Sequence, residues 1–359
     1  MPRCTGCSSA CERPTGRGAG VSARLHDWFQ DTWYGEPARG RWLQPLAWLF
    51  SAMVRVRRAL YRCRLLGSHR SSRPVIIVGN LTVGGTGKTP FVIWLARQLE
   101  ARGLQVGIVS RGYRRAVGPA RRVTREDTAA TAGDEPLLLF RRLARPVAVG
   151  ARRSEAVRLL ETDCDVIVCD DGLQHYALAR DFEIAVVDGA RGFGNGRLLP
   201  AGPLREPLTR LSEVDAVVVN GAGFELPGAV RMALVPSAVI AVDGQARRAL
   251  ADFSGQSVVA IAAIGHPGRF FALLRAHGLQ VQERTLPDHA AWTPASAGAG
   301  EGRPVLMTEK DAVKCTGPGW RDAWYVEVES EVNAASTKRL LDRIADVVAA
   351  RHPGSHQRE

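Results

Sequence analysis

A short β-branched run followed by a glycine-rich loop constrains this chain more than any other feature. Residues 75–78 read VIIV, which is typical of a buried parallel strand, and the glycines that follow cannot continue it. Residues 91–100 (FVIWLARQLE) then predict a helix. A loop in this position turns bare backbone N–H groups and a helix N-terminus toward an anion. The stretch therefore predicts a phosphate-binding loop.

The loop itself supplies suitable side chains. We expect the nucleotide to contact Thr82, Val83, Gly84, Gly85, Thr86, Gly87, Lys88 and Thr89, which we call the phosphate loop. Lys88 adds a positive charge, and Thr89 has a hydroxyl suited to Mg²⁺. The general pattern G-x-x-x-x-G-K-[ST] has glycine where this chain has Thr82, so the match is partial. A glycine-rich loop without function is the weaker interpretation, since strand, loop, Lys-Thr and helix coincide.

Further strands that end in polar residues predict the rest of the sheet. Residues 106–109 form a second short strand before Ser110 and Arg111, and strands alternate with helices, which predicts a doubly wound parallel α/β sheet. Residues 166–169 end in Asp170 and Asp171. A carboxylate there would lie beside Thr89 and hold Mg²⁺ directly or through water. The next strands end in Asp188 and Asn220, and the Gly- and Pro-rich loop 192–207 between them is expected to be functional.

Asp134 lies in the motif GDEP, before Pro136 and a helical run that extends to Leu143. From this pattern alone we expect Asp134 to be the N-cap of a helix.

The basic charge is concentrated at the front of the chain. Of the net charge of +12, residues 1–73 carry +9, from 13 Arg and four acids. Residues 42–66 predict an amphipathic helix, which is too short in its apolar part to cross a membrane because crossing takes about 20 apolar residues. One face carries Leu46, Leu49, Phe50, Met53, Val56 and Leu60, and another carries Arg55, Arg58 and Arg62.

With Trp42 and Trp48, this helix is expected to lie on an anionic membrane surface. The alternative is a helix that packs on the domain with solvated arginines. We expect no nucleic-acid partner, because no recognised binding motif occurs. There is no pattern of a cleavable signal peptide.

The strand and helix pattern restarts near residue 232 and predicts a smaller α/β domain. His289 follows one of its strands, and His266 follows another. The predicted organisation is an extension (1–23), a membrane-associating segment (24–72), a nucleotide-binding domain (73–231), the smaller domain (232–349) and a tail (350–359). Cys4, Cys7 and Cys11 have roughly metal-ligand spacing, but their surroundings favour a disordered tail.

A set of motifs then resembles a known family. The motifs GNLTVGGTGKTP, SRGY, GDEP, DDGLQH, GFGNGRLLPAGPLREP, GHPGRF, PDH and TEKDAVK, in this order from about residue 24 to 345, closely resemble the tetraacyldisaccharide 4′-kinase family. That family also lacks the first glycine of the general loop pattern. The resemblance implies a P-loop kinase fold of two α/β/α domains, whose N-terminal helix docks on the cytoplasmic face of the bacterial inner membrane.

The resemblance also implies a reaction and roles for residues. ATP would phosphorylate the 4′-hydroxyl of a tetraacyldisaccharide 1-phosphate, the lipid A precursor, to give lipid IVA, with Mg²⁺ and with a monomeric enzyme. Asp134 would take the hydroxyl proton, paired with His289, and domain closure would complete the site. The resemblance assigns Lys88 and Thr89 to the β/γ-phosphates and Mg²⁺, Asp170, Asp171 and Glu206 to the metal, and Arg205 and Arg153 to charge neutralisation. Arg152 is an alternative to Arg153, and His266 an alternative to His289.

Two other classes of function remain as alternatives. A membrane-associated ATPase switch of the partitioning type also combines such a loop with an amphipathic helix, but it has a signature lysine where this chain has Val83. A non-catalytic nucleotide-binding module is disfavoured by the acids at positions 134, 170, 171 and 206, because a binder needs few acids near a triphosphate.

Overall fold

The computed structural model describes residues 21–35, 40–113, 115, 118–286 and 292–351, with side chains from residue 28 onward. Three expectations lie outside these residues: the extension up to residue 20 with its three cysteines, the tail from residue 352, and His289.

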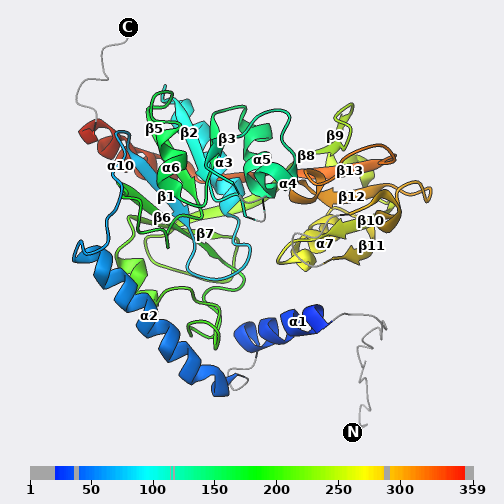
Figure 1. Cartoon of the computed structure of the whole chain (residues 1–359). Helices are drawn as coiled ribbons and strands as arrows, with labels where there is room; N and C mark the ends of the chain where they lie inside the picture. The colour runs from blue at the N-terminus through cyan, green and yellow to red at the C-terminus, as the bar shows by residue number, and fades with distance from the viewer. Residues whose placement is uncertain (1–20, 36–39, 114, 116–117, 287–291, 352–359) are drawn as a thin grey trace.

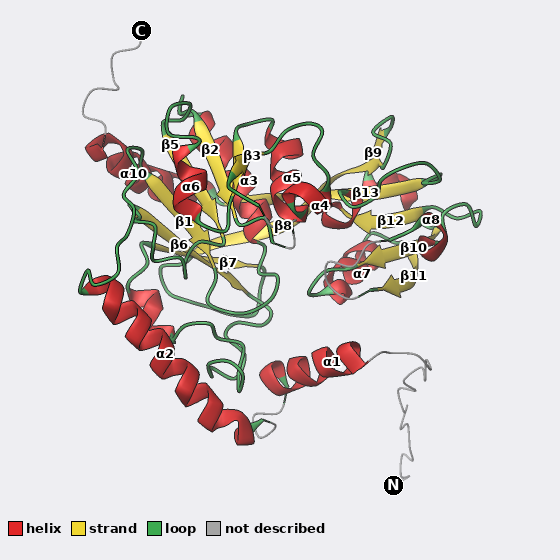
Figure 2. Ribbon diagram, in the orientation of Figure 1, coloured by secondary structure: helices red, strands yellow, loops and turns green. Residues whose placement is uncertain are grey.

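Thirteen strands form one mixed sheet, which is mostly parallel (Figures 1 and 2). Their order is β11-β10-β12-β13-β8-β7-β6-β1-β5-β2-β4-β3, and β9 pairs with β8. The strands are β1 (Val75–Gly79), β2 (Val106–Ser110), β3 (Arg121–Arg122), β4 (Val147–Val149), β5 (Val166–Asp170), β6 (Phe182–Asp188), β7 (Ala216–Asn220), β8 (Val230–Ala241), β9 (Arg247–Arg248), β10 (Ser257–Ala262), β11 (Gln280–Thr285), β12 (Val305–Thr308) and β13 (Ala323–Val332).

The helices connect these strands and cover them. The α-helices are α1 (Val21–Tyr34), α2 (Gln44–Arg62), α3 (Lys88–Glu100), α4 (Ala129–Ala132), α5 (Asp134–Leu143), α6 (Arg153–Arg158), α7 (Pro267–Ala276), α8 (Pro294–Ala297), α9 (Glu309–Ala312) and α10 (Ala334–Arg351). Short 3₁₀ helices are η1 (Arg41–Leu43), η2 (Leu208–Ser212) and η3 (Leu250–Phe253).

Strand β1 lies in the sheet between β5 and β6, parallel to both. Its alternate side chains enter two cores: Ile76 and Val78 pack with α3, α5 and α10, whereas Ile77 packs with α6 on the other face. Because helices cover both faces, the strand is apolar throughout rather than alternating. The predicted parallel α/β sheet with a phosphate-loop strand at its centre is confirmed.

A long antiparallel pair, β8 with β13, joins two parts of the sheet. We call β9 to β12 with α7 to α9 the second lobe, and β1 to β7 with their helices the first lobe. The expected division at residue 231 falls inside β8, and α10 packs in a core of the first lobe. The assignment of separate domains stays a prediction.

Helix α2 lies along the lower edge of the first lobe in Figure 1. Its predicted apolar face is exposed: Leu49 is 60% exposed and Met53 61%. The helix contacts the first lobe through Ala47, Ser51 and Arg58 instead. Among the helices of the described residues, none has the length and apolar character that a membrane span requires.

Candidate functional site

The phosphate loop connects the end of β1 to the start of α3. Gly87 has φ of +88°, and a Cβ atom there would lie 2.3 Å from Nδ2 of Asn220. Only glycine fits this position without strain. Asn220, at the end of β7, donates from Nδ2 to the Thr86 carbonyl at 3.1 Å and so supports the loop from the neighbouring strands.

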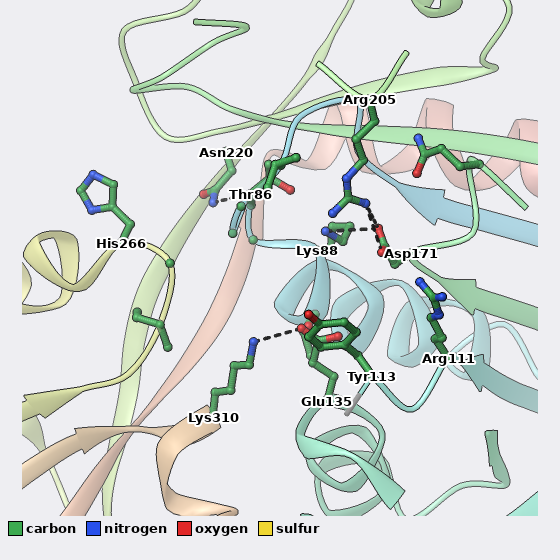
Figure 3. A pocket seen from close by; sticks show the side chains of 18 of the residues that line it. Thr86, Lys88, Arg111, Tyr113, Glu135, Asp171, Arg205, Asn220, His266 and Lys310 are labelled. Carbon is green, nitrogen blue, oxygen red and sulfur yellow. Dashed lines mark hydrogen bonds and ion pairs between the residues drawn. The ribbon is translucent and has the colours of Figure 1, made fainter. Parts of the chain in front are cut away.

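A cavity of about 1740 Å³ opens over this loop (Figure 3). Residues 83–89 form its base, and Ser110 and Arg111 line it as expected from the end of β2. The second lobe contributes Lys310 of α9 and residues 264–266. Helix α2 contributes Met53 and Arg57, so the cavity reaches from the phosphate loop to the exposed apolar helix.

Asp171 is held by two cations inside this cavity (Figure 3). Oδ1 of Asp171 lies 3.5 Å from Nζ of Lys88 and 3.2 Å from Nη1 of Arg205. Burial alone would raise the pKa of Asp171, but the cations, Lys88 foremost, hold it below its usual range. The Asp171 side chain is therefore ionised and fixed beside the loop lysine.

Asp170, in contrast, is fully buried, and neither of its carboxylate oxygens has a hydrogen-bond partner among the described residues. Burial, and next the Glu135 carboxylate, raise the pKa of Asp170 to about 7. A buried carboxylate without donors is costly unless a cation neutralises it. Carboxylate oxygens such as these are the donors that Mg²⁺ prefers.

The exposed fractions of two adjacent arginines differ: Arg152 is the N-cap of α6, and Arg153 is its first residue. Arg153 is 4% exposed, lines the cavity, and donates from Nη2 to the Asp171 carbonyl at 3.1 Å. The Arg152 side chain is 81% exposed and pairs with Glu155. Of these two arginines, Arg153 lines the cavity and Arg152 does not.

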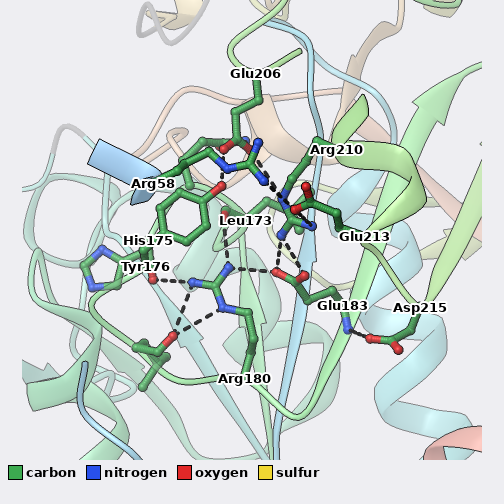
Figure 4. A network of polar contacts seen from close by, with 12 residues as sticks. Arg58, Leu173, His175, Tyr176, Arg180, Glu183, Glu206, Arg210, Glu213 and Asp215 are labelled. Atoms are coloured by element: carbon green, nitrogen blue, oxygen red, sulfur yellow. Dashed lines mark hydrogen bonds and ion pairs between the residues drawn. The ribbon is translucent and has the colours of Figure 1, made fainter. Parts of the chain in front are cut away.

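Glu206 is buried within a polar network (Figure 4). It accepts hydrogen bonds from the Tyr176 hydroxyl and, at 3.1 Å, from Nε2 of Gln174. Burial, and next the Glu206 carboxylate, raise the pKa of Tyr176 to about 12, so Tyr176 remains a donor. The network continues through Arg210 and Glu213 to Arg58 of α2.

The structure corrects one expectation about Asp134. The N-cap of α5 is Gly133, with φ of +96°, and Asp134 is the first helical residue. Asp134 is not among the described residues that line the cavity, whereas its neighbour Glu135 lines it and accepts from Nζ of Lys310 at 3.1 Å. A carboxylate in the first turn of a helix is favoured in its ionised form by the helix dipole.

His266 lines the cavity and caps α7, where its Nδ1 accepts from the Arg269 N–H at 3.2 Å. Burial, and next Arg191, lower the pKa of His266.

Several site residues were not predicted as such from the sequence. Asn220 was noted only as a strand end, and Glu135, Tyr176 and Lys310 received no role. For Tyr176 and Lys310 their positions inside DDGLQHY and TEKDAVK were a usable signal. For Glu135, the signal was its position in the motif GDEP, directly after Asp134.

Comparisons with known proteins identify the family of this chain. The family model described as tetraacyldisaccharide-1-P 4′-kinase (LpxK) matches residues 39–346. A tetraacyldisaccharide 4′-kinase of Methylobacillus flagellatus is 47% identical over 321 residues, which are 88% of this chain and 96% of the relative. The crystal structure of LpxK from Aquifex aeolicus in complex with ATP has a TM-score of 0.73 and 29% identity, and the match covers 86% of this chain and 99% of that chain. This chain therefore belongs to the tetraacyldisaccharide-1-P 4′-kinase family.

Proposed function

We propose that this chain transfers the γ-phosphate of ATP to the 4′-hydroxyl of a tetraacyldisaccharide 1-phosphate and so acts as a kinase in lipid A synthesis, which is the activity of its family. The observation that carries the proposal is the single cavity that joins the phosphate loop to the apolar face of α2. A water-soluble nucleotide and a lipid could meet there.

The transfer needs positioning and positive charge more than covalent help from the protein. The hydroxyl oxygen attacks the γ-phosphorus, the bond from that phosphorus to the β–γ bridging oxygen breaks, and ADP leaves. Lys88, the loop N–H groups and Arg153 would stabilise the charge on the phosphoryl group. We assign the hydroxyl proton to Asp134, and either His289 or His266 would assist it.

A Mg²⁺ ion would be held by Thr89, Asp170, Asp171 and Glu206; of these, the unpartnered oxygens of Asp170 support its part in the set. Bound there, the ion would neutralise charge on the phosphate oxygens. Glu206 accepts hydrogen bonds from Gln174 and Tyr176, which fix the orientation of the carboxylate that it would offer to the ion.

We further propose that the enzyme is a monomer that binds the anionic cytoplasmic face of the inner membrane through α2. The exposed apolar face of α2 supports this placement. Two of the three arginines that the sequence places on the other face of this helix, Arg58 and Arg62, pair with Glu213 of the first lobe. Arg55 is exposed on the same helix.

The deciding experiment measures ³²P transfer from γ-labelled ATP to purified tetraacyldisaccharide 1-phosphate in detergent micelles. We expect labelled lipid with wild type, and a loss of at least about 10²-fold in kcat for Asp134→Asn, because a general base contributes about 10²- to 10⁴-fold. The exposed Asp243→Asn serves as the control.

Steady ATP hydrolysis without labelled lipid would contradict the proposal and favour a partitioning-type switch. An Asp134→Asn enzyme with wild-type kcat would reject Asp134 as the base, and Glu135→Gln would be tested next.

A further inference from the structure

Lysine is nearly absent from this chain. Of 48 Lys and Arg residues only four are lysines: Lys88, Lys310, Lys314 and Lys338. Most basic side chains of this chain are therefore arginines, and the four lysines occupy positions that do not require an arginine. Arginine and lysine differ because lysine places a compact, strongly hydrated charge at the end of a flexible stem. Each lysine therefore merits an explanation from its surroundings.

Three of the four have clear surroundings. Lys88 belongs to the phosphate loop. Lys314 is buried and donates to Asp311 at 2.7 Å within the second lobe. Lys338 is 79% exposed on α10 and pairs with Asp342. The remaining lysine, Lys310, lines the nucleotide cavity although it belongs to the second lobe.

Lys310, from the second lobe, pairs with Glu135, whereas Lys88 pairs with Asp171 in the same cavity (Figure 3). Nζ of Lys310 lies 3.1 Å from Oε1 of Glu135, in the first turn of α5. Burial alone would raise the pKa of Glu135, but Lys310 and next Lys88 lower it. Both ammonium groups are therefore close enough to act on Glu135, and Lys310 lies beside the region where the loop lysine meets the phosphates.

Hydrogen bonds and an ion pair hold α9, the short helix that contains Lys310, in place. Asp311, which is fully buried, accepts from the Ala263 N–H at 3.0 Å and from the Thr308 hydroxyl at 2.7 Å. Glu309 accepts from Nη1 of Arg142, in the last turn of α5, at 2.7 Å. Successive residues of α9 thus contact both ends of α5, which fixes the direction in which Lys310 extends.

We propose that Lys310 is a catalytic residue that the second lobe supplies to the γ-phosphate of bound ATP, with Glu135 holding its ammonium group in place before the nucleotide arrives. An ammonium group has three N–H donors, so it can contact Glu135 and a phosphate oxygen together. Its charge comes from the second lobe, whereas Lys88 and Arg153 belong to the first, and from there it would oppose the negative charge that the transfer develops.

The test compares Lys310→Met and Lys310→Arg with the control Lys338→Met. Dissociation constants are measured for ADP and for a non-hydrolysable ATP analogue, and kcat is measured at saturating ATP and lipid. For Lys310→Met we expect a kcat lower by about 10²- to 10³-fold. The analogue should bind about 10-fold or more weakly, the value of one charged hydrogen bond, while ADP affinity changes less than about 2-fold.

Lys310→Arg keeps the positive charge but not its compact geometry, so we expect it to restore less than about a tenth of the lost kcat. Lys338→Met should match wild type in every measurement. Equal losses of ADP and analogue affinity in Lys310→Met would show that Lys310 only braces the lobes. Wild-type kcat in either Lys310 variant would also overturn the proposal.

This inference rests on the proposed kinase activity only for its kcat measurements. If wild type phosphorylated no lipid, the function would fail, and the comparison of ADP with the analogue would still decide the role of Lys310.

Discussion

The pKa of His175 reflects both its burial and the positive charge of the arginines around the site. His175 lines the cavity between Gln174 and Tyr176, and its Nε2 atom is buried without a partner among the described residues. Burial, and next the nearby guanidinium of Arg153, lower its pKa to about 4. A protonated imidazole is therefore disfavoured in the folded protein but not in the unfolded chain.

This difference predicts an acid sensitivity. Between pH 6.5, the ordinary His pKa, and about 4, the unfolded state binds a proton that the folded state does not, so His175 contributes to loss of stability as the pH falls. When the pH is lowered from 7 to 5, we expect the midpoint temperature of unfolding to fall less for His175→Gln than for wild type. Thermal unfolding at the two pH values measures it. Equal losses in both proteins would contradict the shifted pKa.

For individual residues, the sequence motifs predicted which side chains lie around the phosphate loop. Lys88, Asp171 and Arg205 meet because the carboxyl ends of parallel strands lie at one edge of the sheet. The sequence could not predict that Lys310 and Glu135 meet, since 175 positions separate them and no local pattern encodes that contact. The roles of Asp134 and His289 stay predictions.

Helix α2 exposes several large apolar side chains to solvent. Trp42 and Trp48, before and within it, are 70% and 66% exposed, and Leu46, Leu49 and Met53 extend the same apolar surface. A large exposed apolar surface in a water-soluble protein marks an interaction site. The face that touches the first lobe is small and includes the Arg58 to Glu213 ion pair.

Charging this face should detach the protein from lipid. We expect Leu46→Glu with Leu49→Glu to lower binding to vesicles that contain anionic phospholipid by about 10-fold or more, because each buried leucine is worth about 1.5–3 kcal/mol. Activity on detergent-dispersed substrate should stay within about 2-fold of wild type. Leu159→Glu, at the end of α6, is the control.

Vesicle co-sedimentation measures the binding. Unchanged sedimentation of the double variant would show that α2 is not the membrane contact and would favour the alternative of a helix that packs on the domain with solvated arginines.

Most apolar runs of the sheet were readable from the sequence, but β8 was not, and neither were the short strands β3, β4 and β9. Strand β8 contains Pro236, which cannot donate to a neighbouring strand and usually argues against a strand interior. The structure accommodates it at an irregularity of the pairing, where the register shifts between Glu327 and Val328 of β13. Bulges of this kind depend on the partner strand, so the local sequence could not reveal β8.

For the whole molecule, the most telling interaction is the cluster around Arg142. Its guanidinium lies 2.7 Å from Glu309 of the second lobe and 2.6 Å from Glu329 of β13, and its side chain is 7% exposed. Burial raises the pKa of Glu309, and Arg142 acts against that rise. The first and second lobes are thus held together by a nearly buried cation.

Removing this cation should loosen the second lobe. We expect Arg142→Met to lower the free energy of unfolding by about 3 kcal/mol, because breaking a buried pair leaves carboxylates without compensation. Arg247→Met removes a 62% exposed arginine from Glu327 and should cost less than about 1 kcal/mol. Urea unfolding measures both. Similar values for the two variants would show that the Arg142 cluster does not hold the lobes.

The β8 and β13 pair described above has a mechanical consequence. Nine residues of β13, Trp324 to Val332, are paired with β8 across the region where the lobes meet. Lobes joined by hydrogen-bonded strands cannot swing freely, since any approach of α9 to the phosphate loop must twist or bend the shared ribbon. If the lobes close as predicted, this ribbon resists the closure as a torsion spring does, because its elastic energy rises as the strands twist.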